Sequence, residues 1–426
     1  MTRMRNIQEV ALPLVNMAFR GASLAGRFIL SVYLAKYVGL RSVGVFGLIS
    51  GIVGLAPAIL GLGLNYFMNR EIIDKPVLDA GHKIRDRLLV TVFMVVLAVA
   101  VGFGLWAAGL LESDVNVYLL VLVVALETVA FDIHMSIISL RMPVFANFLI
   151  FIRSSSWIYP YILIGFFFPA YRTVEFMLSL WGGALFFNYL VLLVKFRGWP
   201  WVEILAKPVD LTWVSHRRKA VSLVYLSDIG IVGSIYADRF AIESVAGLEL
   251  TGIFMFFWSL ANAVQTLVNT AVIQVAFPRL VSAYKGGSES GWSHILRNEL
   301  IKVFLGGIAA SACVYFATRI ILPHLGREQL MSMPLLLPSM LFAALLRLLS
   351  DVLNCGLYSR GMDKPWAMTN ILGVGLSLGT TFAAIVWFGL EAVGAGMATT
   401  AATLLVARSL ILYGAKIRLP KLARGS

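Results

Sequence analysis

Long apolar runs recur along the whole chain, and each is long enough to cross a lipid bilayer as a helix. The hydrocarbon core of a bilayer requires roughly 20 predominantly apolar residues in helical form. The runs predict helices at 12–37, 43–68, 88–110, 117–140, 144–170, 174–194, 219–245, 250–277, 299–322, 332–358, 366–388 and 392–414. Hydrophobic residues make up 59% of the chain and charged residues only 13%, which excludes a soluble globular protein. We therefore expect an all-α polytopic membrane protein with about twelve transmembrane helices.

Basic residues are distributed unequally between the two sides of the predicted membrane. When the N-terminus is placed in the cytoplasm, the opposite connections hold few basic residues beyond Arg41, Arg172 and Arg327. Cytoplasmic connections carry the excess of Lys and Arg in membrane proteins, so both termini are predicted to be cytoplasmic. The net charge of +13 mostly reflects this asymmetry and does not indicate a nucleic-acid partner. Because Arg20 interrupts the first apolar run, we interpret that run as a retained span and not as a cleaved signal peptide.

Short motifs repeat between the two halves of the chain. The repeated motifs are GLRSVGVF at 39–46 and GLELTGIF at 247–254, AGRF at 25–28 and ADRF at 237–240, and the pairs Asp132 with Arg141 and Asp351 with Arg360. Matches in the same order at a similar offset predict duplication of a six-helix unit. Six helices return the chain to its starting side, so we expect two pseudo-symmetric six-helix lobes in the same orientation around a central cavity.

The repeat predicts a division of the chain into four parts. These are an N-lobe at 1–195, a cytoplasmic linker at 196–218, a C-lobe at 219–415 and a basic cytoplasmic tail at 416–426. The linker places Trp199, Trp201, Ile204, Leu205, Leu211 and Trp213 among basic residues. This pattern is typical of an amphipathic segment at the membrane surface, and a simple tether between lobes remains an equal alternative.

Two arginines lie inside the first apolar run, far from either of its ends. Arg20 and Arg27 are seven residues apart, which places them on roughly one face of a helix. A central arginine that faces lipid costs about 2.5 to 3.5 kcal/mol. We therefore expect this face to point toward a polar interior, which suggests a cationic cavity and an anionic cargo.

Further ionisable residues lie inside the predicted spans. Arg153 and Arg239 join Arg20 and Arg27 as candidates for the cavity, and Arg239 is the C-lobe counterpart of Arg27. The carboxylates Glu127, Asp132 and Asp228 either take part in coupling to an ion or neutralise the arginines. Arg347 and Asp351 are four residues apart, a spacing that allows a local ion pair or a role in the cavity. Lys302, Arg319 and Arg408 lie near predicted helix ends, from which they are expected to snorkel to the surface.

A polar stripe marks the eighth predicted helix. Asn262, Gln265 and Asn269 follow one another at spacings of three and four residues, which aligns them on one helical face. Amides form hydrogen bonds with sugar hydroxyls, so the stripe is a candidate wall for a glycan. Hydrogen bonding between helices is the equally weighted alternative.

The sequence contains no pattern of residues that is typical of an enzyme. We find no Ser/His/Asp set, metal-ligand spacing or phosphate-binding loop, and the only cysteines are Cys313 and Cys355. The predicted connections on the outer side are short. We therefore expect a protein that is not an enzyme and has no cofactor or metal.

The repeated motifs resemble those of a known family. AGRF followed by GLRSVGVF, and residues 237–280 from ADRF to FPRL, resemble the polysaccharide-transporter branch of the multidrug/oligosaccharidyl-lipid/polysaccharide flippase superfamily, which includes the Wzx-type O-antigen flippases. The resemblance implies alternating access by two lobes that moves a polyprenyl-pyrophosphate-linked oligosaccharide across the bacterial inner membrane. Such export serves the biosynthesis of lipopolysaccharide O-antigen, capsule or exopolysaccharide.

The same resemblance implies roles for residues and partners. Arg20, Arg27, Arg153 and Arg239 would bind the pyrophosphate of the carrier lipid, since the cavities of these flippases are cationic. Besides the lipid-linked oligosaccharide and the membrane lipids, the implied partners are a polysaccharide polymerase and a chain-length regulator. Coupling to protons, sodium or the membrane potential stays open.

Three other functions compete with this interpretation. A multidrug or other small-molecule cation antiporter of the same superfamily would need an anionic pocket, whereas bases outnumber acids inside the predicted spans. A major-facilitator carrier shares the number of helices, but the connection between the second and third helices lacks its expected motif. An enzyme such as a glycan polymerase or ligase is the weakest of the three.

Overall fold

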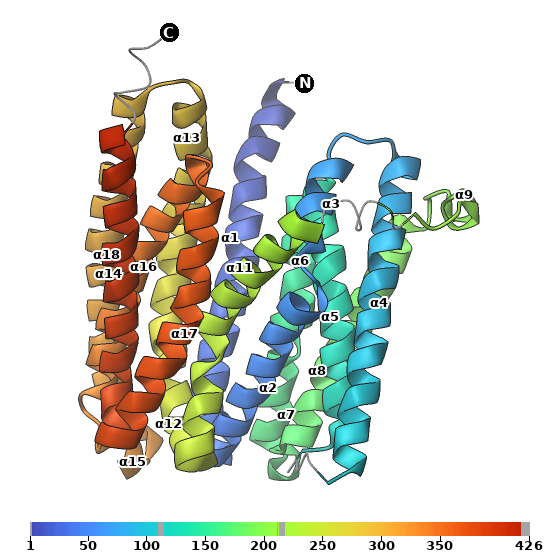
Figure 1. Ribbon diagram of the computed structural model, residues 1–426. Coiled ribbons are helices and arrows are strands. Elements are labelled where there is room, and N and C mark those ends of the chain that lie inside the picture. The colour runs from blue at the N-terminus through green and yellow to red at the C-terminus, as the bar shows by residue number, and fades with distance from the viewer. Residues whose placement is uncertain (1, 110–114, 211, 213–217, 419–426) are drawn as a thin grey trace. The chain divides into compact units, whose positions relative to one another are not determined.

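The computed structural model describes residues 2–109, 115–210, 212 and 218–418, and these ranges contain helices and no strand. In chain order the helices are α1 (Thr2–Tyr33), α2 (Leu40–Leu60), α3 (Leu64–Ile72), α4 (Val77–Ala107), α5 (Val117–Ser139), α6 (Pro143–Phe151), α7 (Ile158–Phe167), α8 (Val174–Phe196), α9 (Trp201–Ala206), α11 (Arg218–Tyr236), α12 (Asp238–Val268), α13 (Gln274–Lys285), α14 (Glu289–Leu325), α15 (Glu328–Met331), α16 (Leu336–Ser359), α17 (Asp363–Phe388) and α18 (Val393–Arg418) (Figure 1). The fold is therefore all-α, as the sequence predicts.

Within the described ranges, ten helical segments have the length and hydropathy of a membrane span. One of them, Val221–Lys285, holds two successive predicted spans because Gly247, with a φ of 77°, interrupts the helix. Glycine adopts this left-handed conformation without the steric penalty of a Cβ atom. Together with α1, the segments account for the twelve predicted spans. This confirms the predicted class of fold.

Besides Leu34–Val38 at the end of α1, two short stretches of π-helix join successive helices where the predicted spans continue. Ile152–Ser156 joins α6 to α7, and Asn269–Ile273 joins α12 to α13. A wider π turn disturbs the regular hydrogen-bond ladder and is frequent at functional positions. Arg153 and Asn269, both predicted site residues, lie in these two stretches.

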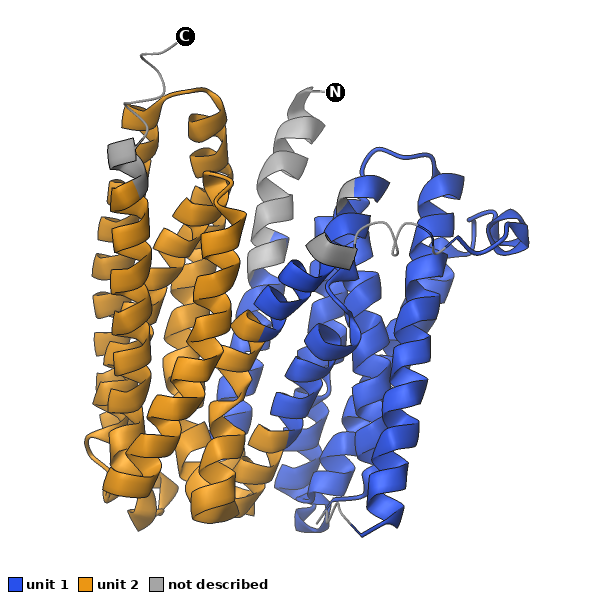
Figure 2. Cartoon of the chain, viewed as in Figure 1, with its two compact units in different colours: residues 1–33, 49–229 blue, residues 34–48, 230–426 orange. Residues whose placement is uncertain are grey.

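The chain divides into two compact units (Figure 2). Unit 1 comprises residues 1–33 and 49–229, and unit 2 comprises residues 34–48 and 230–426. The beginning of α2 therefore groups with unit 2, and the first part of α11 groups with unit 1. The predicted boundaries at 195 and 219 stay a prediction. Leu211 and Trp213 of the linker lie outside the described residues, as does most of the tail.

Unit 1 is held together by apolar side chains from α5, α6 and α8. Ile137, Ala146, Leu149, Ile152 and Leu192 form one buried cluster. Trp157 stacks on Trp181 with 5.2 Å between ring centroids. In unit 2, α16 contacts α12, α13, α14, α17 and α18. A helix that other helices surround must be apolar on most of its surface, and α16 accordingly buries leucine, methionine and alanine side chains.

The two copies of the longer repeated motif meet in unit 2. A Cβ atom on Gly44 would overlap the carbonyl oxygen of Leu248, and a Cβ atom on Gly252 would overlap that of Leu40. Gly44 and Gly252 are equivalent positions of the motif. The beginning of α2 and the second half of α12 thus cross with their backbones in contact. Small residues permit such close approach between membrane helices.

Candidate functional site

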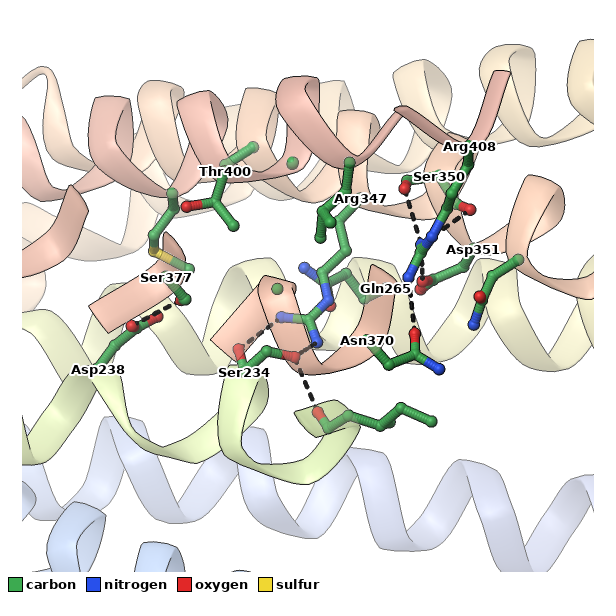
Figure 3. A pocket seen from close by; sticks show the side chains of 17 residues that line it. Ser234, Asp238, Gln265, Arg347, Ser350, Asp351, Asn370, Ser377, Thr400 and Arg408 are labelled. Atoms are coloured by element: carbon green, nitrogen blue, oxygen red, sulfur yellow. Dashed lines mark hydrogen bonds and ion pairs between the residues drawn. The ribbon is translucent and has the colours of Figure 1, made fainter. Parts of the chain in front are cut away.

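A polar cavity lies within unit 2, among α11, α12, α16, α17 and α18 (Figure 3). Its volume is about 70 Å³, enough for a few water molecules or a small ion. The charged and amide side chains that line it are Asp238, Gln265, Arg347, Asp351, Asn354, Asn370 and Arg408. Ionisable groups at this depth of a membrane protein usually mark a functional site, so we treat the cavity as the candidate site.

Arg408 anchors one end of the cavity. Its guanidinium donates to Ser350 Oγ at 2.8 Å and to Asn370 Oδ1 at 2.8 Å, and Nη1 lies 3.7 Å from Asp351. Only 4% of Arg408 is exposed. The prediction that this residue snorkels to the surface was therefore wrong. Sequence position places Arg408 near a helix end, whereas polar groups on α16 and α17 bind its head group inside the protein.

Arg347 lies in the middle of the cavity, between its two ends (Figure 3). Its guanidinium donates to the backbone oxygen of Ser234 at 2.9 Å and to Ser234 Oγ at 3.1 Å. The local ion pair between Arg347 and Asp351 that the spacing allows does not form within 4.0 Å. Asp351 is paired with Arg408 instead. Arg347 therefore connects α16 to α11, and the predicted alternative of a role in the cavity agrees with its place in the lining.

Asp238 lies at the opposite end of the cavity from Arg408 (Figure 3). It is 3% exposed and accepts hydrogen bonds from Ser377 Oγ at 2.8 Å and Thr381 Oγ1 at 3.1 Å. Among the described residues, no basic group lies within ion-pair distance of this carboxylate. Its neighbour in sequence, Arg239, points elsewhere, because consecutive residues lie on different faces of a helix. Asp238 was not among the site residues predicted from the sequence.

The polar stripe of α12 contributes to the cavity at one position. Gln265 lines the cavity, whereas Asn262 and Asn269 are half-buried and lie outside its lining. The structure thus brings Gln265 together with Arg347 and Asp351. Contact of the stripe with a glycan stays a prediction.

Two buried charge networks lie in unit 1. Arg153 forms an ion pair with Glu127 and lies over the ring of Phe131. Arg87 lies 3.0 Å from Asp132, which also accepts hydrogen bonds from Asn65 and Thr91. In the structure, arginines therefore neutralise Glu127 and Asp132, which was one of the two predicted alternatives. A role of these carboxylates in coupling to an ion stays a prediction. Arg87 precedes the predicted start of the third span at 88 and would therefore lie in a polar connection, yet only 1% of it is exposed.

The remaining predicted residues lie in different environments. Arg239 is 1% exposed, donates to the backbone oxygen of Gly47 at 2.9 Å and lies between the rings of Tyr236 and Trp258. Arg27 is exposed on α1 and near enough to Glu127 to act on it electrostatically. Arg20 and Asp228 are half-buried. Within unit 1, Arg27 and Arg153 both act electrostatically on Glu127, and Arg20 and Arg153 both act on His134. Arg239 belongs to unit 2.

The described part of the chain contains no group of three or more His, Cys, Asp and Glu side chains with the arrangement of a metal site. The chemistry that the cavity offers consists of carboxylates, guanidinium groups, amides and hydroxyls. These groups bind ions and polar ligands by charge and hydrogen bonds.

The helical bundle defines the chain as a polytopic membrane protein. Solved structures of MATE transporters have a similar fold. One neighbour is described as the inward-facing conformation of a multidrug resistance MATE family transporter of the MOP superfamily, with a TM-score of 0.65, 13% identity, and coverage of 97% of this chain and 99% of that one.

Two further neighbours are similar to the chain over almost their whole length. A crystal structure of MATE in complex with MaL6 has a TM-score of 0.61 and 12% identity, with 97% of both chains covered. An outward-facing conformation of a multidrug resistance MATE family transporter has a TM-score of 0.55 and 12% identity, with 96% and 94% covered. No family model and no curated protein sequence matches the chain. At these identities the likeness shows the fold alone.

Proposed function

We propose that this protein is a membrane transporter that works by alternating access. The observation that supports this most directly is the likeness of the fold, over nearly the whole chain, to transporters captured in inward-facing and outward-facing conformations. The polar cavity of unit 2 supports it further, because buried ionisable groups in membrane helices usually line transport pathways.

For the cargo we propose a polyprenyl-pyrophosphate-linked oligosaccharide, exported for surface polysaccharide biosynthesis. The main support for this cargo is the environment of Arg27. Arg27 lies in the middle of the first predicted span and is exposed, and the nearby Glu127 is already bound by Arg153. The positive charge of Arg27 is therefore available to an anionic head group. A guanidinium suits a pyrophosphate because it offers several donors in one plane.

The membrane potential favours export of such a cargo. A head group with two negative charges that leaves an inside-negative cell gains about 4.6 kcal/mol per 100 mV, at about 2.3 kcal/mol per charge. Export of this kind requires no covalent chemistry. It therefore agrees with a site that consists of charges and hydrogen-bonding groups.

A second candidate is a multidrug or other small-molecule cation antiporter. Asp238 favours it, because this buried carboxylate is bound by two hydroxyl groups and has no basic ion-pair partner among the described residues. The descriptions of the structural neighbours also fit this candidate better than export of a lipid-linked glycan. A carboxylate in such a site attracts a cationic substrate or a coupling ion.

Substitution of Arg27 separates the two candidates. In the glycan-export proposal, Arg27→Gln accumulates lipid-linked oligosaccharide in the inner leaflet and reduces surface polysaccharide at unchanged protein level, whereas Arg27→Lys retains part of the function. Surface polysaccharide is measured by lectin binding to intact cells, and lipid-linked oligosaccharide of the inner leaflet is measured by its protection from a glycosidase added to spheroplasts. The matched control is Arg319→Gln, since Arg319 is also exposed and lies over the ring of Tyr315. Normal export by Arg27→Gln would remove this assignment.

The same strains are tested for resistance to cationic drugs. If the protein is a cation antiporter, its deletion sensitises cells to these drugs and leaves surface polysaccharide unchanged. Asp238→Asn then reproduces the deletion, and Arg27→Gln does not. Loss of surface polysaccharide without a change in drug resistance would exclude the antiporter.

A further inference from the structure

The short helix α9 (Trp201–Ala206) presents an uncovered apolar face. Val202 is 82% exposed, Leu205 65% and Trp201 43%. With 3.6 residues per turn, these three side chains share one side of the helix, and Glu203 lies on the other. Exposed apolar side chains that form a contiguous patch mark an interaction surface.

The backbone of α9 is held firmly against the beginning of α4. Arg85 Nη1 donates to the carbonyl oxygens of Ile204 at 2.5 Å and Lys207 at 2.7 Å, and His82 Nε2 lies 3.2 Å from that of Glu203. The side chain of Ile204 is fully buried, and its Cδ1 lies against Gly81. These contacts satisfy the carbonyl groups that the last turn of a helix leaves without partners. The apolar face of α9 is therefore displayed in a defined orientation.

The apolar face of α9 lies close to the ends of two helices that could span a membrane. The helix follows the last residue of α8, Phe196, after four residues, and it packs beside the first two turns of α4 (Figure 1). Both α4 and α8 have the length and hydropathy of a membrane span. Three basic residues close to α9 in the sequence, Lys195, Arg197 and Lys207, are all exposed.

We propose that α9 is an interfacial anchor that binds the anionic phospholipids of the cytoplasmic leaflet. Trp201, Val202 and Leu205 insert at the boundary between head groups and acyl chains, as the apolar face of an amphipathic helix does. Lys195, Arg197 and Lys207 bind the phosphates of anionic lipids, a charge complementarity that each basic residue near the surface strengthens. Arg85 is a positioning residue that holds the anchor to α4. This inference is independent of the cargo.

Environment-sensitive labels test the anchor in the full-length protein. Cys313 and Cys355 are the only cysteines, so Cys313→Ala with Cys355→Ala provides a background for single cysteines. Val202→Cys, labelled with a fluorophore and reconstituted into vesicles containing phosphatidylglycerol, is expected to be quenched by nitroxide-labelled acyl chains and protected from iodide. The matched control is the neighbouring Glu203→Cys, which is expected to show several-fold stronger quenching by iodide.

Two further measurements test the lipid preference and the role of Arg85. Lys195→Gln with Lys207→Gln should reduce acyl-chain quenching at position 202 in mixed vesicles, and vesicles of phosphatidylcholine alone should do the same. Arg85→Gln should increase access of iodide to position 202 while the protein remains monodisperse. Equal access of iodide to positions 202 and 203 in anionic vesicles would overturn the proposal. Acyl-chain quenching at position 202 that does not change with the charge of the lipids would also overturn the proposal.

Discussion

Asp132 and Asp351 occupy equivalent positions in the two halves, and each binds an arginine from another helix. The partner of Asp132 is Arg87 on α4, whereas the partner of Asp351 is Arg408 on α18. The predicted repeat therefore preserves the acid but not the helix that supplies its partner arginine. Unit 1 uses this acid in a closed network, and unit 2 places it in the lining of a cavity.

The closed network of unit 1 leads to a prediction about stability. Arg87→Ala should lower the free energy of unfolding by roughly 3–5 kcal/mol, because it leaves Asp132 as an uncompensated buried charge. The change is measured as a shift in the midpoint of thermal unfolding in one detergent. Arg87→Ala with Asp132→Ala should recover part of the loss.

An exposed ion pair of the same chemistry provides the control. Arg141 lies 2.8 Å from Asp74, and their side chains are 73% and 65% exposed. Arg141→Ala should change stability by less than about 1 kcal/mol, since solvent screens an exposed pair. If Arg87→Ala proves no more harmful than Arg141→Ala, the buried network does not stabilise the fold.

At the scale of helices, the repeated motif has a structural explanation. The two copies of Gly-Leu-x-x-x-Gly-x-Phe pack against each other, and Gly44 and Gly252 allow the backbones of α2 and α12 to touch. Arg239 lies beside this crossing and donates to Gly47. Because Arg239 is buried there, we expect a substitution of Arg239 to impair folding. A substitution of the exposed Arg27 should not have this effect.

We expect the crossing of α2 and α12 to be sensitive to one methyl group. Gly252→Ala should destabilise the protein by roughly 1–3 kcal/mol, because the new Cβ atom forces the helices apart. Gly375→Ala is the control, since a Cβ atom there meets nothing within 4 Å, and the better helix propensity of alanine is worth up to about 1 kcal/mol. The difference is measured from the midpoints of thermal unfolding of both variants. Equal stability would show that the helices do not cross as closely as described.

The first residue of α4 differs from the start that the sequence predicts for the third span. The third span was predicted to start at 88, but the helix begins at Val77. Its first turns carry His82, Arg85 and Arg87, which a reading of hydropathy places in a polar connection. These side chains bind Glu203, the end of α9 and Asp132, and packing against such partners keeps a polar segment helical.

At the scale of the whole molecule, the asymmetry of basic residues leads to a test of topology. Reporter fusions after Gly389 and at the C-terminus should lie on opposite sides of the membrane, with the C-terminus in the cytoplasm. Alkaline phosphatase should be active at the first position and inactive at the second, and a fluorescent protein should show the reverse. The opposite pattern would contradict the predicted orientation and would place α9 on the outer leaflet.

The all-α class of the fold and the approximate number and order of the spans followed from the sequence alone, while the duplication of a six-helix unit stays a prediction. Hydropathy is a property of each residue, and a membrane requires it to persist over a whole span, so the signal is strong and local. Arg27 and Gln265 were selected from the sequence as polar residues inside apolar spans, and the structure places Gln265 in the lining of the cavity. Tertiary structure decided which charges are neutralised. Arg87 with Asp132, Arg153 with Glu127 and Arg408 with Asp351 are pairs between different helices, and charge pairing depends on distance in space.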